Sequence, residues 1–165
     1  MSINGRYLRL SPRQLQRAAT EPDWAREWVA ELDEDEEEDG AADRGRLHET
    51  GSAGAVLELL LRRHDFPVDV VHGEEELTAA GDWGYGPPRC LTPEQVGTAD
   101  EAFAALPPGT LVDGIAPAEL AAAVPLPAGW TAEDVLHLAS GHYRALADFL
   151  HTAARYRHAV LVWSE

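Results

Sequence analysis

The spacing of apolar residues along the chain predicts several amphipathic helices. Trp24, Trp28 and Leu32 recur every four residues, which places them on one face of a helix. The longest apolar stripe begins after Thr131 and continues for about seven turns at 3.6 residues each. We predict that this last helix is the central helix of the core.

Two short segments carry the same signal for the start of a helix. Residues 11–14 (Ser-Pro-Arg-Gln) and 92–95 (Thr-Pro-Glu-Gln) each combine a hydroxyl residue, a proline and a glutamine able to close a capping box. We expect a helix to begin at each of them. Leucines and valines over 46–63 predict a buried helix, and a short one is expected near 117–123.

Three other segments have the pattern of strands. Residues 6–10 and 67–72 alternate between the two faces of a strand, and 67–72 is rich in β-branched residues. Residues 159–163 form an apolar run typical of a central strand with both faces covered. These elements predict an α+β fold, a single domain over 1–165 with a small mixed sheet and helices packed mainly on one face.

The charge of the chain restricts its partners. The 165 residues include 13 basic and 29 acidic ones, for a formal net charge of -16, and every basic residue is an arginine. Nucleic acid and anionic membranes would repel such a chain, because both bind basic surfaces. The absence of lysine excludes Schiff-base chemistry and phosphate loops of the Walker type. A basic partner or a cation remains compatible.

Seven consecutive acidic residues, Asp33–Asp39, follow the second predicted helix. Like charges in a block repel one another, so we expect a solvated and mobile segment over 33–45. The alternative is a docking patch for a basic partner or a loose cation site. An EF-hand loop is excluded, because its ligands alternate with other residues around a glycine.

The cysteine content and the first residues indicate a compartment. Cys90 is the only cysteine, so the chain forms no internal disulfide, no CxxC redox pair and no cysteine zinc site. The first ten residues do not resemble a secretory leader, and no apolar run has the roughly 20 residues of a membrane span. We expect a cytoplasmic location without a membrane anchor.

The seven histidines do not have the spacing of a metal site. His137 and His142 are five residues apart, on opposite sides of a helix, and there is no HExxH motif. One polar stripe of the last helix could form an anion cradle, although a solvated face is the simpler interpretation; it consists of His137, Arg144, Asp148, His151 and Arg155. On a strand, His72 and Asp69 would point to opposite faces, so a structural histidine is favoured there over a general base.

The most unusual local chemistry lies in residues 81–89, Gly-Asp-Trp-Gly-Tyr-Gly-Pro-Pro-Arg. Three glycines are costly to order, whereas the two prolines stiffen the end of the segment, so the chain holds Trp83, Tyr85 and Arg89 in a defined geometry. Aromatic rings and arginine dominate binding hot spots and carboxylate recognition. The alternative is a structural corner in which Tyr85 packs and Arg89 pairs with a buried acid. The order of the glycines excludes a dinucleotide-binding fingerprint.

The stretch Tyr85-Gly-Pro-Pro-Arg-Cys-Leu-Thr-Pro-Glu-Gln-Val96 resembles the YfbM-like family of small bacterial proteins, a domain of unknown function. Residues 10–15, residues 73–77 and the segment from Trp130 to Val162 resemble it as well. The resemblance implies an α+β domain and brings no established activity. The family's Asp-Lys-x-Trp stretch is missing between Asp39 and Ser52, which puts any family site containing it in doubt. The motif residues that carry over are Tyr85, Gly86, Pro87, Arg89, Thr92 and Pro93.

Two functions of different classes fit these observations. The first is a binding module, regulatory or immunity-like, whose acidic surface and 81–89 loop engage a basic protein or a small carboxylate ligand. The second is a small enzyme with His72 or His151 as general base and Arg89 as anchor for a substrate anion. No complete triad or metal set supports an enzyme, so we favour binding and expect no cofactor. The candidate binding residues are His72, Trp83, Tyr85 and Arg89.

Overall fold

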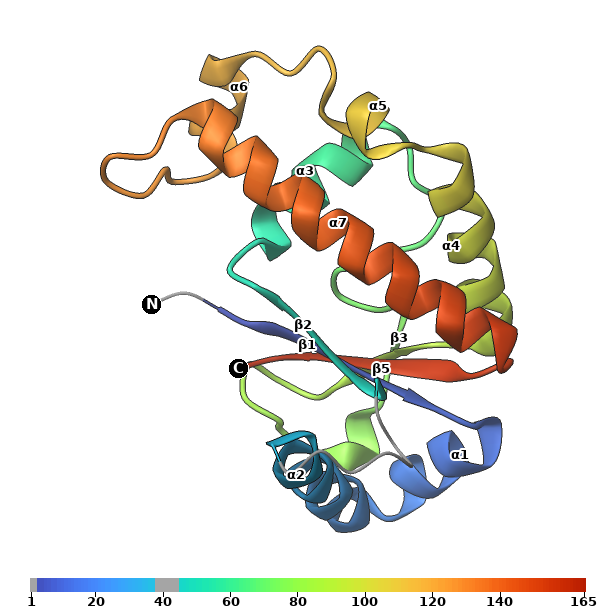
Figure 1. Ribbon diagram of the computed structural model, residues 1–165. Coiled ribbons are helices and arrows are strands. Elements are labelled where there is room, and N and C mark those ends of the chain that lie inside the picture. The colour runs from blue at the N-terminus through green and yellow to red at the C-terminus, as the bar shows by residue number, and fades with distance from the viewer. Residues whose placement is uncertain (1–2, 38–44) are drawn as a thin grey trace.

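A five-stranded antiparallel sheet forms the centre of the computed structural model, which describes residues 3–37 and 45–165 (Figure 1). The strand order is β2-β1-β5-β4-β3. The bounds are Gly5–Leu10 for β1, Leu47–Gly51 for β2, Glu75–Glu76 for β3, Arg89–Leu91 for β4 and Ala159–Ser164 for β5. Every pairing between these described strands is antiparallel, so the expectation of a mixed sheet is wrong.

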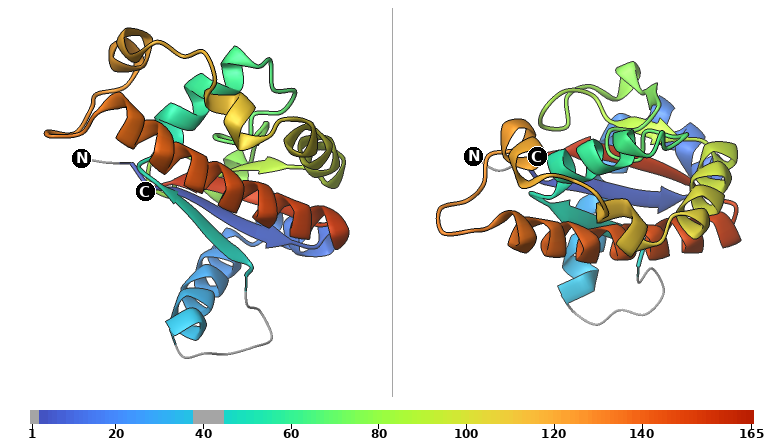
Figure 2. Two further views of the ribbon diagram at one scale, coloured as in Figure 1. Left: turned by 45° about the horizontal axis from the view of Figure 1, so that its top comes forward. Right: turned by 90° about the horizontal axis from the view of Figure 1, so that it is seen from above.

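Helices cover both faces of the sheet (Figures 1 and 2). The larger layer contains α3 (Gly54–Arg63), α4 (Pro93–Ala105), α5 (Pro108–Val112), α6 (Pro117–Ala123) and α7 (Ala132–Arg155). The smaller layer contains α1 (Pro12–Thr20), α2 (Pro22–Glu37) and the 3₁₀ turn η1 (Thr78–Ala80). The α+β class is therefore confirmed, with most helices on one face and a second group on the other.

The two central strands supply both hydrophobic cores through their alternation. In β1, Tyr7 faces the α7 side, whereas Leu8 faces the α2 side. In β5, Val162 and Trp163 divide in the same way. Successive side chains of a strand point to opposite faces, so a strand that is buried throughout must have a covered sheet on both sides. The prediction of a central strand at 159–163 is confirmed.

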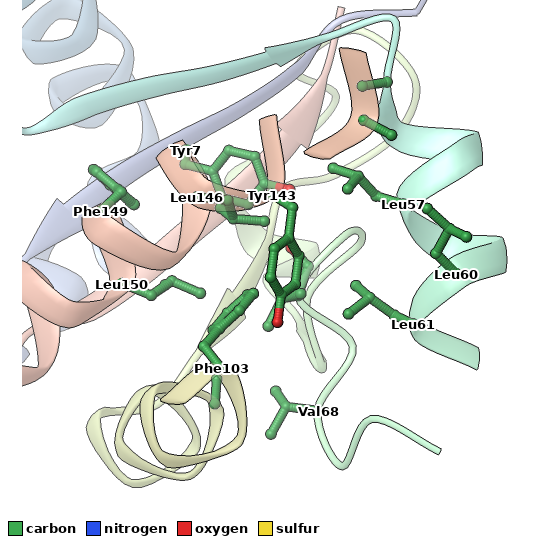
Figure 3. Packing of buried hydrophobic residues seen from close by; sticks show 14 of the residues in the cluster. Tyr7, Leu57, Leu60, Leu61, Val68, Phe103, Tyr143, Leu146, Phe149 and Leu150 are labelled. Carbon is green, nitrogen blue, oxygen red and sulfur yellow. The ribbon is translucent and has the colours of Figure 1, made fainter. Parts of the chain in front are cut away.

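Helix α7 is the central helix of the larger core, as its apolar stripe predicts. Figure 3 shows its Tyr143 pointing between Phe103 of α4 and the leucines of α3. The rings of Tyr143 and Phe103 are 5.1 Å apart, and the Tyr143 hydroxyl donates a hydrogen bond of 2.6 Å to the carbonyl of Leu106. That hydrogen bond allows a phenol to be buried without a lost partner.

The two predicted capping boxes are present. The Ser11 hydroxyl accepts a hydrogen bond of 3.1 Å from the Gln14 amide, and the Gln14 side chain accepts one of 2.8 Å from the Ser11 amide. Thr92 and Gln95 repeat this exchange at 3.2 and 2.9 Å. Each pair satisfies two amide groups that the first helical turn leaves free, so α1 and α4 begin where the sequence places them.

The helix predicted over 46–63 is wrong in its first part. Residues Leu47–Gly51 form the edge strand β2, and only Gly54–Arg63 form the helix α3. Tertiary pairing decides the outcome, because β2 aligns with β1 through pairs such as Tyr7 with His48. Gly51, with a φ of 54°, then turns the chain from the strand towards the helix.

The strand predicted over 67–72 is also wrong, because this segment is a turn. The Asp69 carboxylate accepts hydrogen bonds from the amides of Val71 (3.2 Å) and His72 (3.0 Å), a local arrangement that competes with strand pairing. Val68 and Val70 are nevertheless buried. The Tyr7 hydroxyl donates 2.9 Å to the Val70 carbonyl, so the alternation of apolar residues reflects a loop anchored in the core.

The acidic run is partly helical. Helix α2 continues to Glu37, and Asp33 in its last part forms an ion pair of 2.5 Å with the buried Arg6 of β1. Residues 38–44 lie outside the described residues, so the mobile segment expected over 33–45 stays a prediction there. In the parts of the chain that the structure describes, no helix combines the length and the apolar character needed to cross a membrane.

Candidate functional site

The loop between η1 and β4 is held in one geometry by its own polar groups. One oxygen of the Asp82 carboxylate accepts hydrogen bonds from the amides of Gly84 (2.8 Å) and Gly86 (3.0 Å). These amides lower the pKa of Asp82. The Trp83 amide donates 2.9 Å to the Gly86 carbonyl and closes the loop. The residues 82–86 therefore form a hydrogen-bonded turn, in agreement with the defined geometry expected from the sequence.

Contacts with the end of β5 fix this loop against the sheet. The Tyr85 amide donates 3.2 Å to the Ser164 carbonyl. Gly84 has a φ of 142°, and a Cβ at this position would collide with the same carbonyl oxygen. Only glycine fits such a backbone conformation and so close an approach. The Tyr85 side chain is left 58% exposed on a rigid support.

Trp83 points to the other side of the sheet and packs in the smaller core. Its ring meets the ring of Trp163 edge to face, with 5.2 Å between centroids. Its indole N–H donates 3.2 Å to the Ala80 carbonyl, and the Arg26 guanidinium lies 5.9 Å from the ring centroid. These contacts assign Trp83 a packing role and separate it from Tyr85.

Arg89 is occupied by the turn that precedes β3. Its Nε donates 3.1 Å to the Gly73 carbonyl, and one terminal nitrogen donates 2.8 Å to the Glu74 carbonyl. The other terminal nitrogen is 3.4 Å from a carboxylate oxygen of Glu76. The guanidinium therefore holds the turn at residues 73–74 through two backbone carbonyls, which agrees with a structural role for Arg89. The expectation that Tyr85 packs and that Arg89 pairs with a buried acid is wrong, because Tyr85 is 58% exposed and the Glu76 side chain is 45% exposed.

His72 is oriented by a carboxylate of its own turn. Its Nδ1 lies 3.1 Å from Asp69 Oδ2, and its Nε2 lies 3.7 Å from Glu58 Oε2 on α3. The expectation that Asp69 and His72 point to opposite faces is wrong, because a turn replaces the strand. The hydrogen bond that His72 donates to Asp69 raises the pKa of His72 against the opposing effect of burial, and the charges of Asp69 and Glu58 raise it further.

A surface hollow of about 460 Å³ brings two of the candidate residues together. His72 and Tyr85 both line it, whereas Trp83 and Arg89 do not. Its other lining groups include Ile3 near the N-terminus, the hydroxyl residues Thr50, Ser52 and Ser164, and Glu58. This hollow therefore combines an exposed aromatic ring with an oriented histidine and a carboxylate.

A second hollow, of about 420 Å³, adjoins the first and shares Ser52 and Ala55 with it. Trp130 and Leu138 line it, and they are 43% and 38% exposed. The apolar pattern of the sequence does not reveal this site, because Leu138 belongs to the apolar stripe of α7 and is interpreted there as core. The available signal was Trp130, a large aromatic residue in a proline-rich segment just before the cap of α7.

The titratable residues outside the two hollows do not form a candidate site. On the polar stripe of α7, His151 Nδ1 lies 3.0 Å from Asp100 Oδ1 of α4, so a carboxylate of the protein itself already partners this histidine. Burial raises the pKa of Cys90 to about 11, which keeps this thiol protonated. Within residues 3–37 and 45–165, no group of three or more histidine, cysteine or acidic side chains could hold a metal ion.

The fold and the two hollows define an α+β domain whose distinctive surface lies beside the start of α3. A comparison with family models identifies its family: the model described as a domain of unknown function (DUF1877) matches residues 1–163. The chain belongs to this family. Comparisons with curated proteins and with solved structures gave no match.

Proposed function

We propose that the protein is a binding module that engages a basic protein partner through the hollow between Tyr85 and His72. The observation that carries this proposal is the exposed Tyr85 ring on the hydrogen-bonded 82–86 turn. An aromatic side chain on a rigid backbone binds with little loss of conformational entropy, and tyrosine is common at binding hot spots.

Charge supports a basic partner over a small carboxylate ligand. Among the described residues that line the hollow, none is an arginine, and Glu58, which pairs with Arg62 of α3 at 2.8 Å, is the one carboxylate. Arg89, the anchor considered for a carboxylate ligand, donates to two carbonyls and faces Glu76. The net charge of -16 would accelerate the encounter with a cationic partner through long-range attraction.

We also propose a subfamily, a cellular location and a role for the chain. We infer that the chain is a YfbM-like member of its family, on the strength of the Tyr85–Val96 motif, and that it acts in the cytoplasm as a regulatory or immunity-like adaptor. The charge of the chain supports this role, since acidic proteins often neutralise basic partners by complementary electrostatics.

A small enzyme with His72 as general base is the second candidate, and one observation favours it. Asp69 holds Nδ1 of His72, as an orienting carboxylate holds a catalytic histidine, and His72 lines the hollow. Its Nε2, however, faces Glu58, and Arg89 does not line the hollow to anchor a substrate anion. The binding module therefore agrees with more of the geometry.

The test is affinity capture from the native cells with wild-type protein, the Tyr85→Ala variant and a matched control. Tyr156→Ala is the control, because Tyr156 is another exposed tyrosine, 66% exposed, outside the hollow. We expect wild type and Tyr156→Ala to retain the same partner and Tyr85→Ala to lose it. Equal recovery by all three proteins would contradict the proposal.

A purified partner then allows a quantitative measurement by calorimetry. Loss of a hot-spot tyrosine costs about 2 kcal/mol or more, which is a factor of roughly 30 in Kd. Thermal melts of both variants show whether each is folded. If His72→Gln left partner affinity unchanged and abolished a chemical turnover of the partner, the enzyme would replace the binding module.

A further inference from the structure

The exposed large hydrophobic residues of the described chain are not scattered. They are Ile3, Tyr85, Trp130, Leu138 and Tyr156. Ile3 and Tyr85 line the first hollow, Trp130 and Leu138 line the second, and only Tyr156 lies elsewhere. Exposed apolar residues that gather along a depression mark an interaction surface more often than residues that are dispersed.

The two hollows adjoin each other at the start of α3. Ser52 and Ala55 line both of them, so one wall is common. Figures 1 and 2 show the beginning of α3, the C-terminus and the loop that enters α7 along one side of the molecule in all views. We call the two hollows together the α3 groove.

The two ends of the α3 groove differ in chemistry. The first hollow contains His72, the exposed ring of Tyr85 and Glu58. One oxygen of Glu58 pairs with Arg62 at 2.8 Å and the other lies 3.7 Å from His72 Nε2, so a cationic group would bind Glu58 in competition with these two neighbours. The described lining of the second hollow contains no charged side chain and is dominated by alanine, valine, proline, leucine and Trp130. A carboxylate beside an aromatic ring favours a cationic group, whereas the second hollow favours an apolar side chain.

We propose, on the basis of the proposed binding function, that the α3 groove receives one segment of a partner protein with two anchors. An arginine or lysine of that segment lies between Tyr85 and Glu58, and a neighbouring aromatic or aliphatic side chain fills the hollow between Trp130 and Leu138. A second copy of this chain is a poor occupant, because two molecules of net charge -16 repel each other.

The probe is a displayed library of random 12-residue peptides, selected against the full chain. Enriched peptides are synthesised with a fluorescent label, and their Kd values are measured by anisotropy. We expect them to pair a basic residue with a nearby aromatic or aliphatic residue. Replacement of the basic residue by glutamate, or of the apolar residue by serine, should raise Kd at least tenfold.

Variants of the protein locate the two anchors. We expect Leu138→Asp and Trp130→Ala to raise Kd at least tenfold, Glu58→Gln to raise it several-fold and reduce its salt dependence, and Tyr156→Ala to leave it unchanged. Leu138 and Trp130 are partly exposed, so replacing either of them should leave the protein folded. Thermal melts identify any variant that is misfolded. The second hollow is tested by two variants, so that the other one still gives a result in that case.

The possible failures are distinguishable. If Tyr85→Ala weakens binding and both variants of the second hollow bind like wild type, the two-anchor segment is overturned and the binding function through the first hollow stands. If the second hollow matters and Tyr85 does not, the binding function through the first hollow is overturned. An absence of enriched peptides, or enrichment of acidic ones, overturns the two-anchor proposal.

Discussion

Arg89 and Gly73 depend on each other for their positions. Arg89 Nε donates 3.1 Å to the Gly73 carbonyl, and a Cβ on Gly73 would lie 2.8 Å from Arg89 Cβ. The backbone of Gly73 has a φ of 90°, which favours glycine. The guanidinium reaches its carbonyl acceptors only because the turn approaches β4 without a side chain between them.

This relationship predicts that Arg89 contributes to stability. Arg89→Ala removes two charge-assisted hydrogen bonds to carbonyls, so we expect the free energy of unfolding to fall by about 1–3 kcal/mol. Urea denaturation measures the change. The control is Arg144→Ala on the exposed face of α7, which should stay within about 0.5 kcal/mol of wild type. An Arg89→Ala variant as stable as the control would show that the hydrogen bonds from Arg89 to the two carbonyls do not contribute to stability.

Two glycine-to-alanine substitutions should change the stability of the protein in opposite directions. Gly84→Ala places a methyl group against the Ser164 carbonyl at a strained φ of 142°, so it should lower stability by about 1–3 kcal/mol. Gly97→Ala lies within α4 with open space around the new Cβ, so it should raise stability by about 0.5–1 kcal/mol. Thermal denaturation compares the two. Stabilisation by Gly84→Ala would contradict the close approach of the loop to β5.

Local signals in the sequence were sufficient where the interaction itself is local. The capping boxes at Ser11 and Thr92 involve groups three residues apart, and the stripe of α7 repeats over many turns, so both could be predicted. The strand β2 depends on pairing with β1, some 40 positions away, and its own residues show weak alternation. The turn at 67–72 depends on the Asp69 carboxylate and on Tyr7, which the apolar pattern does not reveal.

Only the local part of the candidate site could be predicted from the sequence. Glycines and prolines indicated that Tyr85 is held in a defined loop, and its hydrogen bonds confirm the loop geometry. The separation of Trp83 from Tyr85 follows from the packing of Trp83 on Trp163, a contact across 80 residues. His72 and Tyr85 line one hollow although 13 positions and the strand β3 separate them in the sequence, and no local pattern specifies that they come to the same place.

The Asp69 carboxylate should control the titration of His72. Asp69→Asn keeps an oxygen that can accept the amide hydrogen bonds of the turn and removes the charge that faces Nδ1. The pKa of His72 should therefore fall towards the ordinary value of about 6.5. Titration followed by NMR of the ring measures it, and Asp148→Asn on α7 should leave it unchanged. An identical His72 pKa in Asp69→Asn would contradict this role.

The pKa shifts of His72 and Asp69 make the stability of the folded protein depend on pH, in opposite directions. Because folding raises the pKa of His72, its contribution is complete below the unfolded pKa of about 6.5 and is lost as pH rises through the folded value. Folding lowers the pKa of Asp69, because hydrogen bonds from His72 and Val71 outweigh burial. That contribution is present above the unfolded pKa of about 3.9 and is lost as pH falls through the folded value.

His48 should make the protein less stable in mild acid, with a sign opposite to that of His72. Its ring packs 5.2 Å from Phe149 and 5.8 Å from Tyr7, and burial, with a smaller effect of His142, lowers its pKa to about 4. An unfolded histidine titrates near 6.5, so the unfolded chain binds an extra proton between these two values. Stability is therefore complete above about pH 6.5 and decreases as pH falls towards 4.

The comparison of wild type with His48→Phe isolates this effect, because phenylalanine keeps an aromatic ring against Tyr7 and Phe149 and does not titrate. A single proton gives a slope of at most about 1.4 kcal/mol per pH unit, and partial exposure of His48 reduces it. We expect urea denaturation between pH 7 and pH 4.5 to show a steeper loss for wild type than for His48→Phe. Parallel profiles would mean that His48 charges as readily in the folded protein as in the unfolded chain, and the packing of its ring against Tyr7 and Phe149 would then not protect it from water.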